Sequence, residues 1–157
     1  MEGADFEEAE FFRAIDASGA RALLIGRRAL VALGIPVLTA DYDFWLHIED
    51  IVAFNVALES VGLFPTCTPD EARGRGRYVL ENDERVDVLV ARAVPTVDGV
   101  RVAFDDVWPR RRGLEVAPGV TIAVPALDDL MLTKRFGGRP KDLEDIRLLE
   151  ALRREDT

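Results

Sequence analysis

Two aspartates, Asp41 and Asp43, lie two residues apart in a segment rich in aromatic and aliphatic residues. On a β-strand, residues i and i+2 point to the same face, roughly 6.5–7 Å apart, so the two carboxylates can converge. A third acid, Asp87, stands between Val86 and Val88 in another apolar run. If the two runs are neighbouring strands, three carboxylates meet on one sheet face. Such hard oxygen ligands favour Mg²⁺ or Mn²⁺, which can activate a hydroxyl and stabilise a leaving phosphate oxygen.

The alternative to a metal site is an exposed strand face on which these acids have no common function. A chain of this acid content has about five acid-x-acid spacings by chance, and this sequence has five. The acid-x-acid spacing alone is therefore no evidence for a metal site. The context of Asp41 and Asp43 is more informative, because apolar residues follow at once and acids are seldom placed among buried residues without a partner. Both interpretations stay open on these residues alone.

Hydrophobic spacing and glycine or proline breaks predict the elements that must position these acids. Helices are expected at 5–18, 27–33 and 49–61, from Pro125 to the break at Gly137-Gly138, and from Pro140 onward. Strands are expected at 20–25, 41–48, 77–80, 85–91, 100–104 and 120–124, with a turn at 82–83. This order predicts an α/β (α+β) fold, a mixed β-sheet packed by helices, in a single domain over residues 1–157.

Composition excludes several classes of protein. The net charge of −9 repels nucleic-acid phosphates, so contact with RNA would need a local basic patch. A single cysteine, Cys67, excludes an internal disulfide, and a single histidine, His47, argues against histidine-rich metal sites and Ser-His-Asp hydrolases. The absence of an apolar run of about 18 residues and of a basic N-terminal start predicts a cytoplasmic protein without a membrane partner.

Two basic runs, 73–77 and 110–112, could contact tRNA beside an acidic site, but we favour solvated loop charges. Trp45 is expected in the core. Trp108, before a proline, could stack on a base, although burial in a core or interface is favoured.

Several short segments occur in a characteristic order. They are Leu23-Leu24-Ile25-Gly26, Thr39-Ala40-Asp41-Tyr42-Asp43, Val86-Asp87-Val88, Asp129-Leu130-Met131-Leu132-Thr133-Lys134 and Arg139-Pro140-Lys141-Asp142-Leu143-Glu144-Asp145. Together they span residues 23–145, and their order and spacing resemble the minimal nucleotidyltransferase-like proteins of the DNA polymerase beta superfamily. The branch they most resemble is the one found in bacterial toxin–antitoxin and abortive-infection systems.

The resemblance implies a nucleotidyltransferase-like fold and a metal-dependent transfer of a nucleoside monophosphate from a nucleoside triphosphate to a hydroxyl of RNA or protein. It implies that Asp41, Asp43 and Asp87 are the catalytic residues and hold Mg²⁺ or Mn²⁺. The nucleotide-binding residues that it implies are Gly26, Arg27, Arg28, Thr39 and Lys134. For Lys134, a helix lysine whose ammonium reaches solvent is an equal alternative. Implied partners are a tRNA or protein acceptor and a cognate toxin or antitoxin protein.

Two positions depart from the family's pattern. Active members usually carry Gly-Gly or Gly-Ser at the turn, where this chain has Gly26 followed by Arg27, and the branch tends to have an arginine where this chain has Val37. Arg27 could obstruct the triphosphate or clamp it, and we expect the clamp. The intact acids favour an enzyme. The altered turn favours the alternative, a catalytically degenerate fold that acts as a protein-binding or antitoxin-like module.

Overall fold

The computed structural model describes residues 7–96, 99–137 and 140–155, with only the backbone course for 134–137. Its helices are α1 (Glu8–Ser18), α2 (Gly26–Ala32), α3 (Ile51–Glu59), α4 (Pro69–Arg75), α5 (Phe104–Val107), α6 (Leu127–Gly137) and α7 (Pro140–Glu155), with 3₁₀ turns η1 (Ile48–Asp50) and η2 (Trp108–Arg110). Its strands are β1 (Ala22–Ile25), β2 (Tyr42–Leu46), β3 (Phe64–Pro65), β4 (Arg77–Glu81), β5 (Arg85–Leu89), β6 (Ala93–Pro95), β7 (Arg101–Ala103), β8 (Arg112–Ala117) and β9 (Val120–Val124). Within these ranges, no helix is both long enough and apolar enough to cross a membrane.

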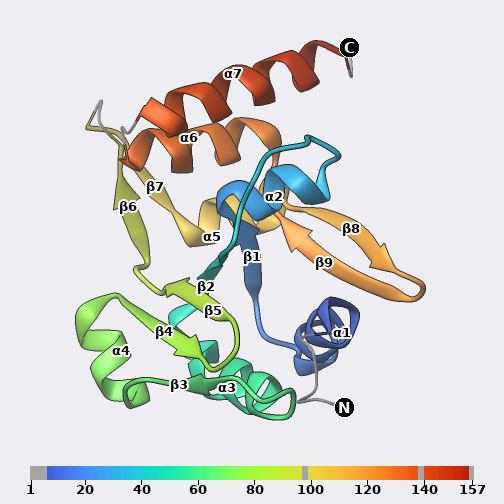
Figure 1. Cartoon of the computed structure of the whole chain (residues 1–157). Coiled ribbons are helices and arrows are strands. Elements are labelled where there is room, and N and C mark those ends of the chain that lie inside the picture. The colour runs from blue at the N-terminus through green and yellow to red at the C-terminus, as the bar shows by residue number, and fades with distance from the viewer. Residues whose placement is uncertain (1–6, 97–98, 138–139, 156–157) are drawn as a thin grey trace.

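Seven strands form one mixed sheet in the order β3-β4-β5-β2-β1-β9-β8, and β6 pairs with β7 in a separate hairpin. β2 lies near the centre, parallel to β5 and antiparallel to β1. Figure 1 shows this sheet with α6 and α7 together at one side of the molecule and α1 and α3 at the other. The expected mixed sheet packed by helices is therefore confirmed.

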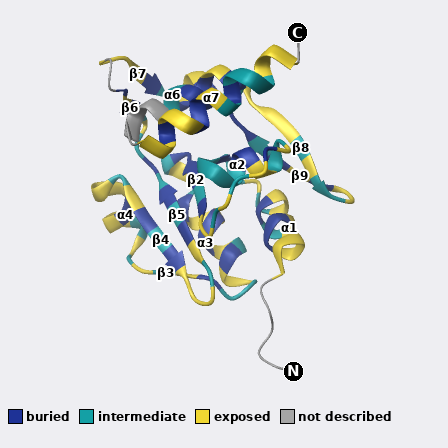
Figure 2. Ribbon diagram, turned by 45° about the horizontal axis from the view of Figure 1, so that its top comes forward, coloured by how far each residue is buried: buried dark blue, intermediate teal, exposed yellow. Residues whose placement is uncertain are grey.

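Alternate residues of β2 serve two separate cores. Tyr42, Phe44 and Leu46 face the larger core, where aromatic rings from α1 and α3 pack against them. Trp45 faces the other side, where it meets Phe104 edge-on at 5.4 Å between ring centroids and donates its indole N–H to a backbone carbonyl. The central strands are accordingly the most buried part of the ribbon in Figure 2. The strand β2 is thus packed on both faces. Trp45 lies in a core, as expected.

Most predicted elements are present, although the short strands β3 and β6 were not predicted, and three further segments need correction. The basic run 73–77 is not a loop, since residues 69–75 form α4, which Thr68 and Glu71 begin with a reciprocal capping box. Phe104 starts α5 instead of ending a strand. Residues 112–117 form β8, which the sequence analysis missed because Gly113 and the pattern of exposed residues hide a strand at the sheet edge. All three errors lie outside the central strands.

The start of β1 is tied to the segment after β2 by an ion pair. The Arg21 guanidinium donates to both carboxylate oxygens of Asp50, at 2.8 and 3.0 Å, and the Arg21 backbone N–H donates to Asp50 Oδ2 at 2.8 Å. The hydrogen bonds from Arg21 hold the pKa of Asp50 below its ordinary value of 3.8. A carboxylate bonded in this way stabilises the fold only while it is ionised.

We predict that Asp50→Asn lowers the free energy of unfolding by about 1–2 kcal/mol near neutral pH, because it weakens charge-assisted hydrogen bonds that are partly screened by solvent. The lowered pKa means that this contribution is complete above the ordinary pKa and is lost as the pH falls through the folded value. Urea unfolding of both proteins at about pH 7 and about pH 3 should show the difference shrinking in acid. An undiminished difference at low pH would contradict this account.

Candidate active site

Gly26 makes the sharp turn between β1 and α2. Its φ of +70° lies in the left-handed region, which glycine adopts without steric cost. The turn also passes directly over the next strand: a Cβ at Gly26 would lie 2.5 Å from Asp43 Oδ2. Backbone conformation and close contact both require glycine here. The Asp43 carboxylate therefore lies directly beneath the turn.

Asp43 and Asp87 are register partners on the neighbouring parallel strands β2 and β5. Register partners point to the same face of a sheet, so the two carboxylates lie side by side, as the sequence predicted. This is the face that also carries Trp45. Both aspartates are half-buried, so the pair is reachable from solvent while its backbone is fixed between packed strands.

Asp41 occupies the residue before β2 and is exposed. The Thr39 hydroxyl donates to the Asp41 carbonyl at 3.3 Å, which shapes the entry to the strand. Among the side chains that the structure describes, no three carboxylate, histidine or cysteine groups are placed to hold a metal ion. The structure thus brings Asp43 and Asp87 together, with Asp41 at the same end of the sheet but without a three-acid cluster.

Arg85 is a charged residue at this site that the sequence analysis did not select. Its guanidinium donates to both carboxylate oxygens of Asp87, with distances of 3.1 to 3.3 Å. The hydrogen bonds to Asp87 raise the pKa of Arg85, and the charges of Glu81 and Asp41 add to the effect. Arg85 could have been found from its position two residues before Asp87, because that spacing places both side chains on one face of β5.

Arg27 turns toward the last helix. Its guanidinium contacts the carboxylate of Asp145 at 3.1 and 3.3 Å, lies 3.7 Å from Glu144, and donates to the Leu38 carbonyl at 3.4 Å. Asp145 is fully buried. Its charge is therefore stabilised by Arg27 inside the chain. To clamp a phosphate as expected, Arg27 would have to reach it while it keeps the contact with Asp145, or exchange Asp145 for the phosphate.

Arg28, the next residue of α2, makes contacts with α1 and with the entry to β2. Its guanidinium lies 4.1 Å from the centroid of the Tyr42 ring, 3.5 Å from Glu8 Oε2, and donates to the Thr39 carbonyl at 3.5 Å. The Tyr42 hydroxyl donates to the same Glu8 oxygen at 2.5 Å, and burial is the main reason that the pKa of Tyr42 is raised. Arg28 therefore links α1, α2 and the entry to β2 beside the candidate site.

One predicted nucleotide-binding residue, Lys134, and one residue of the closing motif, Arg139, have no described side chain. The backbone of Lys134 belongs to α6, but its side chain lies outside the description, and Arg139 lies outside the described residues altogether. From the same closing motif, Asp142 and Asp145 are buried in the first turns of α7.

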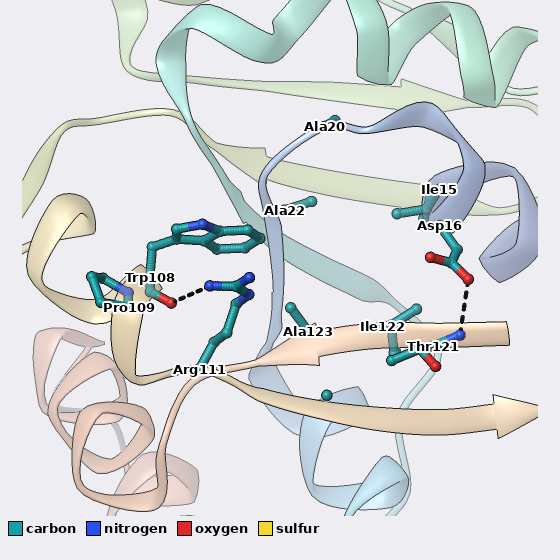
Figure 3. Close-up of a pocket in the computed structure, with 11 residues that line it drawn as sticks. Ile15, Asp16, Ala20, Ala22, Trp108, Pro109, Arg111, Thr121, Ile122 and Ala123 are labelled. Atoms are coloured by element: carbon teal, nitrogen blue, oxygen red, sulfur yellow. Dashed lines mark hydrogen bonds between the residues drawn. The ribbon is translucent and has the colours of Figure 1, made fainter.

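A cavity of about 530 Å³ lies at the far end of β1 from Gly26, where β1 and β9 diverge (Figure 3). At one side of the cavity, Asp16 accepts a hydrogen bond from the Thr121 backbone N–H at 3.0 Å. On the other wall, Trp108 stacks on Phe104 and carries the Arg111 guanidinium at 4.0 Å from its ring centroid. These internal contacts support the structural interpretation of Trp108 over base stacking. None of the candidate acids lines this cavity.

The second basic run is also engaged within the fold. Arg110 donates to both oxygens of the buried Asp129, at 2.9 and 3.0 Å, which joins η2 to α6. Because of this contact and the stacking of Arg111 on Trp108, two of the three arginines in 110–112 have structural roles.

Comparison with known proteins identifies the fold. No family model and no curated protein sequence matches the chain. Among solved structures, a candidate nucleotidyltransferase from Thermotoga maritima is similar over 89% of this chain and 88% of its own, with 16% identity and a TM-score of 0.61. The antibiotic-resistance factor ANT(2'')-Ia is similar over 90% of this chain and 80% of its own, with 15% identity and a TM-score of 0.63.

A second structure of ANT(2'')-Ia, in complex with adenylyl-2''-tobramycin, matches 90% of this chain and 84% of its own, with 17% identity and a TM-score of 0.59. At these identities the likeness concerns the course of the backbone. The chain therefore has the nucleotidyltransferase-like fold that its sequence motifs predicted.

We predict that Gly26→Ala and Gly34→Ala differ in stability. Both glycines have positive φ, so alanine costs about 1–2 kcal/mol of backbone strain at either position. Only at Gly26 does the new methyl group meet another atom, the Asp43 carboxylate, whereas the space at Gly34 is open. Thermal or urea unfolding should therefore show the larger loss for Gly26→Ala. Equal losses would contradict the close contact between the turn and Asp43.

We predict that Arg27→Ala lowers the free energy of unfolding by about 3 kcal/mol, because the fully buried Asp145 loses a paired charge. The double variant Arg27→Ala/Asp145→Ala should lose less than the sum of the two single variants. Urea unfolding of the four proteins measures this coupling. Strict additivity would show that the contact between α2 and α7 does not stabilise the fold.

Proposed function

We propose that this protein is a metal-dependent nucleotidyltransferase that moves a nucleoside monophosphate from a nucleoside triphosphate to a hydroxyl group. The observation that carries the proposal is the pairing of Asp43 with Asp87 in register on one face of the sheet, directly below the glycine turn. The nucleotidyltransferase-like fold supports it.

The residues present fit a divalent cation that arrives with its nucleotide. Mg²⁺ is usually held by one or two carboxylates, with waters and substrate phosphates as the other ligands. Asp43 and Asp87 supply two adjacent carboxylates, and the close approach of Gly26 leaves room for no side chain above Asp43. Asp41, at the same end of the sheet, is the further ligand that the family resemblance implies. When bound, the metal would polarise the phosphate and lower the pKa of the attacking hydroxyl.

The other roles follow from position. Asp87 would also help to accept the proton of the acceptor hydroxyl, because a carboxylate at the reacting oxygen can serve as a general base. The turn at Gly26 would offer backbone N–H groups to the triphosphate, which can approach because glycine has no side chain. Thr39 and Arg28 flank the entry to β2, where nucleotide contacts are expected. Lys134 completes the proposed nucleotide contacts.

The acceptor that we propose is a hydroxyl of RNA, such as tRNA, or of a protein. The proposed setting is a bacterial toxin–antitoxin or abortive-infection system in the cytoplasm, with a cognate toxin or antitoxin protein as partner. The support is the family resemblance of the motif order over residues 23–145.

A second function, a degenerate fold that binds a partner protein without catalysis, is favoured by one specific observation. Arg27 takes the place of a small residue at the turn, and its charge is held by Asp145 instead of being directed at the Asp43–Asp87 pair. The two functions differ in whether Mg²⁺ and a nucleoside triphosphate bind together.

We predict that incubation of the protein with Mg²⁺, each of the four labelled nucleoside triphosphates and total tRNA transfers label, and that Asp43→Asn reduces transfer by about a hundredfold or more. The substitution removes a charged ligand and keeps the shape of the side chain. Gel analysis of the labelled RNA and of the protein itself covers both acceptor classes.

Asp70→Asn is the matched control, because Asp70 is an exposed acid on α4 that pairs only with the neighbouring Arg73 among described residues. It should transfer label like the wild type. Transfer that persists in Asp43→Asn would place the chemistry elsewhere. No transfer, together with no binding of any triphosphate by calorimetry, would favour the binding module.

A further inference from the structure

Arg85 holds one of the two carboxylates on which the proposed function rests. Its guanidinium makes a two-pronged contact with Asp87, at 3.1 to 3.3 Å, from the same face of β5. The side chain of Arg85 is 55% exposed and that of Asp87 is 35% exposed. The contact is thus open to water and can exchange, unlike the buried contact between Arg27 and Asp145.

A divalent cation on Asp87 competes with this guanidinium for the same oxygens. After displacement, Arg85 remains attached two residues from the metal ligand, so its positive charge lies within a few ångströms of the metal. Repulsion between the two cations disfavours a metal that arrives alone. Two acids near Arg85 reduce this repulsion: Glu81, which lies opposite it in the hairpin, and Asp41. They are present with or without the metal, so they do not remove the effect of Arg85 on metal binding.

When a triphosphate binds together with the metal, Arg85 favours binding instead of opposing it. The triphosphate brings several negative charges into the space beside the metal, and a planar guanidinium is suited to two-pronged contact with phosphate oxygens. The displaced arginine then gains a new partner for the one that it lost. The same residue therefore opposes binding of the bare metal and favours binding of the metal–triphosphate complex.

We propose that Arg85 couples metal binding to nucleotide binding by exchanging Asp87 for the triphosphate. This inference rests on the proposed function and adds a positioning and binding residue to it. In thermodynamic terms, Arg85 creates a positive coupling between the two ligands, each of which raises the affinity for the other.

The experiment measures two affinities for the wild type and for Arg85→Gln, by calorimetry or by the electron paramagnetic resonance of Mn²⁺. The probes are Mn²⁺ alone and Mn²⁺ with inorganic triphosphate, which avoids any dependence on the base. Arg85→Gln should bind Mn²⁺ alone about 3- to 10-fold more tightly. It should bind the Mn²⁺–triphosphate complex about 10-fold more weakly.

Arg75→Gln is the matched control, because Arg75 is an exposed residue of α4, which precedes β4 at the end of the hairpin opposite to Arg85, and the change in net charge is identical. Both affinities should stay within about twofold of the wild type, since a distant exposed charge is screened. Arg85→Lys, which keeps the charge, should retain the weak binding of Mn²⁺ alone. Circular dichroism of each variant checks that the fold is kept.

Opposite shifts of the two affinities support the inference, because a general change in charge or folding moves both in one direction. Shifts of the same sign, or none, overturn it. If the wild type binds the Mn²⁺–triphosphate complex and Asp43→Asn does not, the proposed function survives even when Arg85→Gln has no effect. If neither protein binds the complex, the proposed function and the inference both fail.

Discussion

The parallel pairing of β2 with β5 is the constraint on which the candidate site depends. It sets Asp43 opposite Asp87 and fixes the face to which both point, because a shift by one residue would turn these acids into the opposite core. Tyr42, Phe44 and Trp45 hold the register, since each must remain in its own apolar layer. The hydrophobic packing of the strand therefore determines where the charges lie.

The glycine turn depends on the same register. Gly26 can lie against Asp43 only because β1 pairs with β2 so that Ile25 stands opposite Asp43, which brings the next residue over the carboxylate. The two arginines that follow Gly26 are directed away from the Asp43–Asp87 pair. Arg27 contacts α7, and Arg28 contacts Tyr42 and Glu8. The turn therefore offers backbone to the acid pair, while its two charged side chains stabilise the surrounding helices.

Much of this arrangement could be predicted from local sequence. The apolar runs of β1, β2, β5 and β9 and the Asn82-Asp83 turn have strong local signals, and the structure confirms them. The failures have two kinds of cause, one local and one that depends on distant residues. The capping box at Thr68 was present but overlooked beside an arginine-rich run, and Phe104 begins a helix because its ring is needed between Trp45 and Trp108. A requirement that comes from distant residues cannot be read from neighbouring ones.

The sequence by itself determined the fold class, the strands that carry Asp43 and Asp87, and the glycine at the turn, because alternation and backbone conformation are properties of neighbouring residues. Only the tertiary structure decided how the arginines of the glycine turn are used. Whether Arg27 meets a phosphate or Asp145 depends on which elements lie within reach of a long, flexible side chain. Such contacts join residues as far apart as 27 and 145, and sequence spacing carries no information about that distance in space.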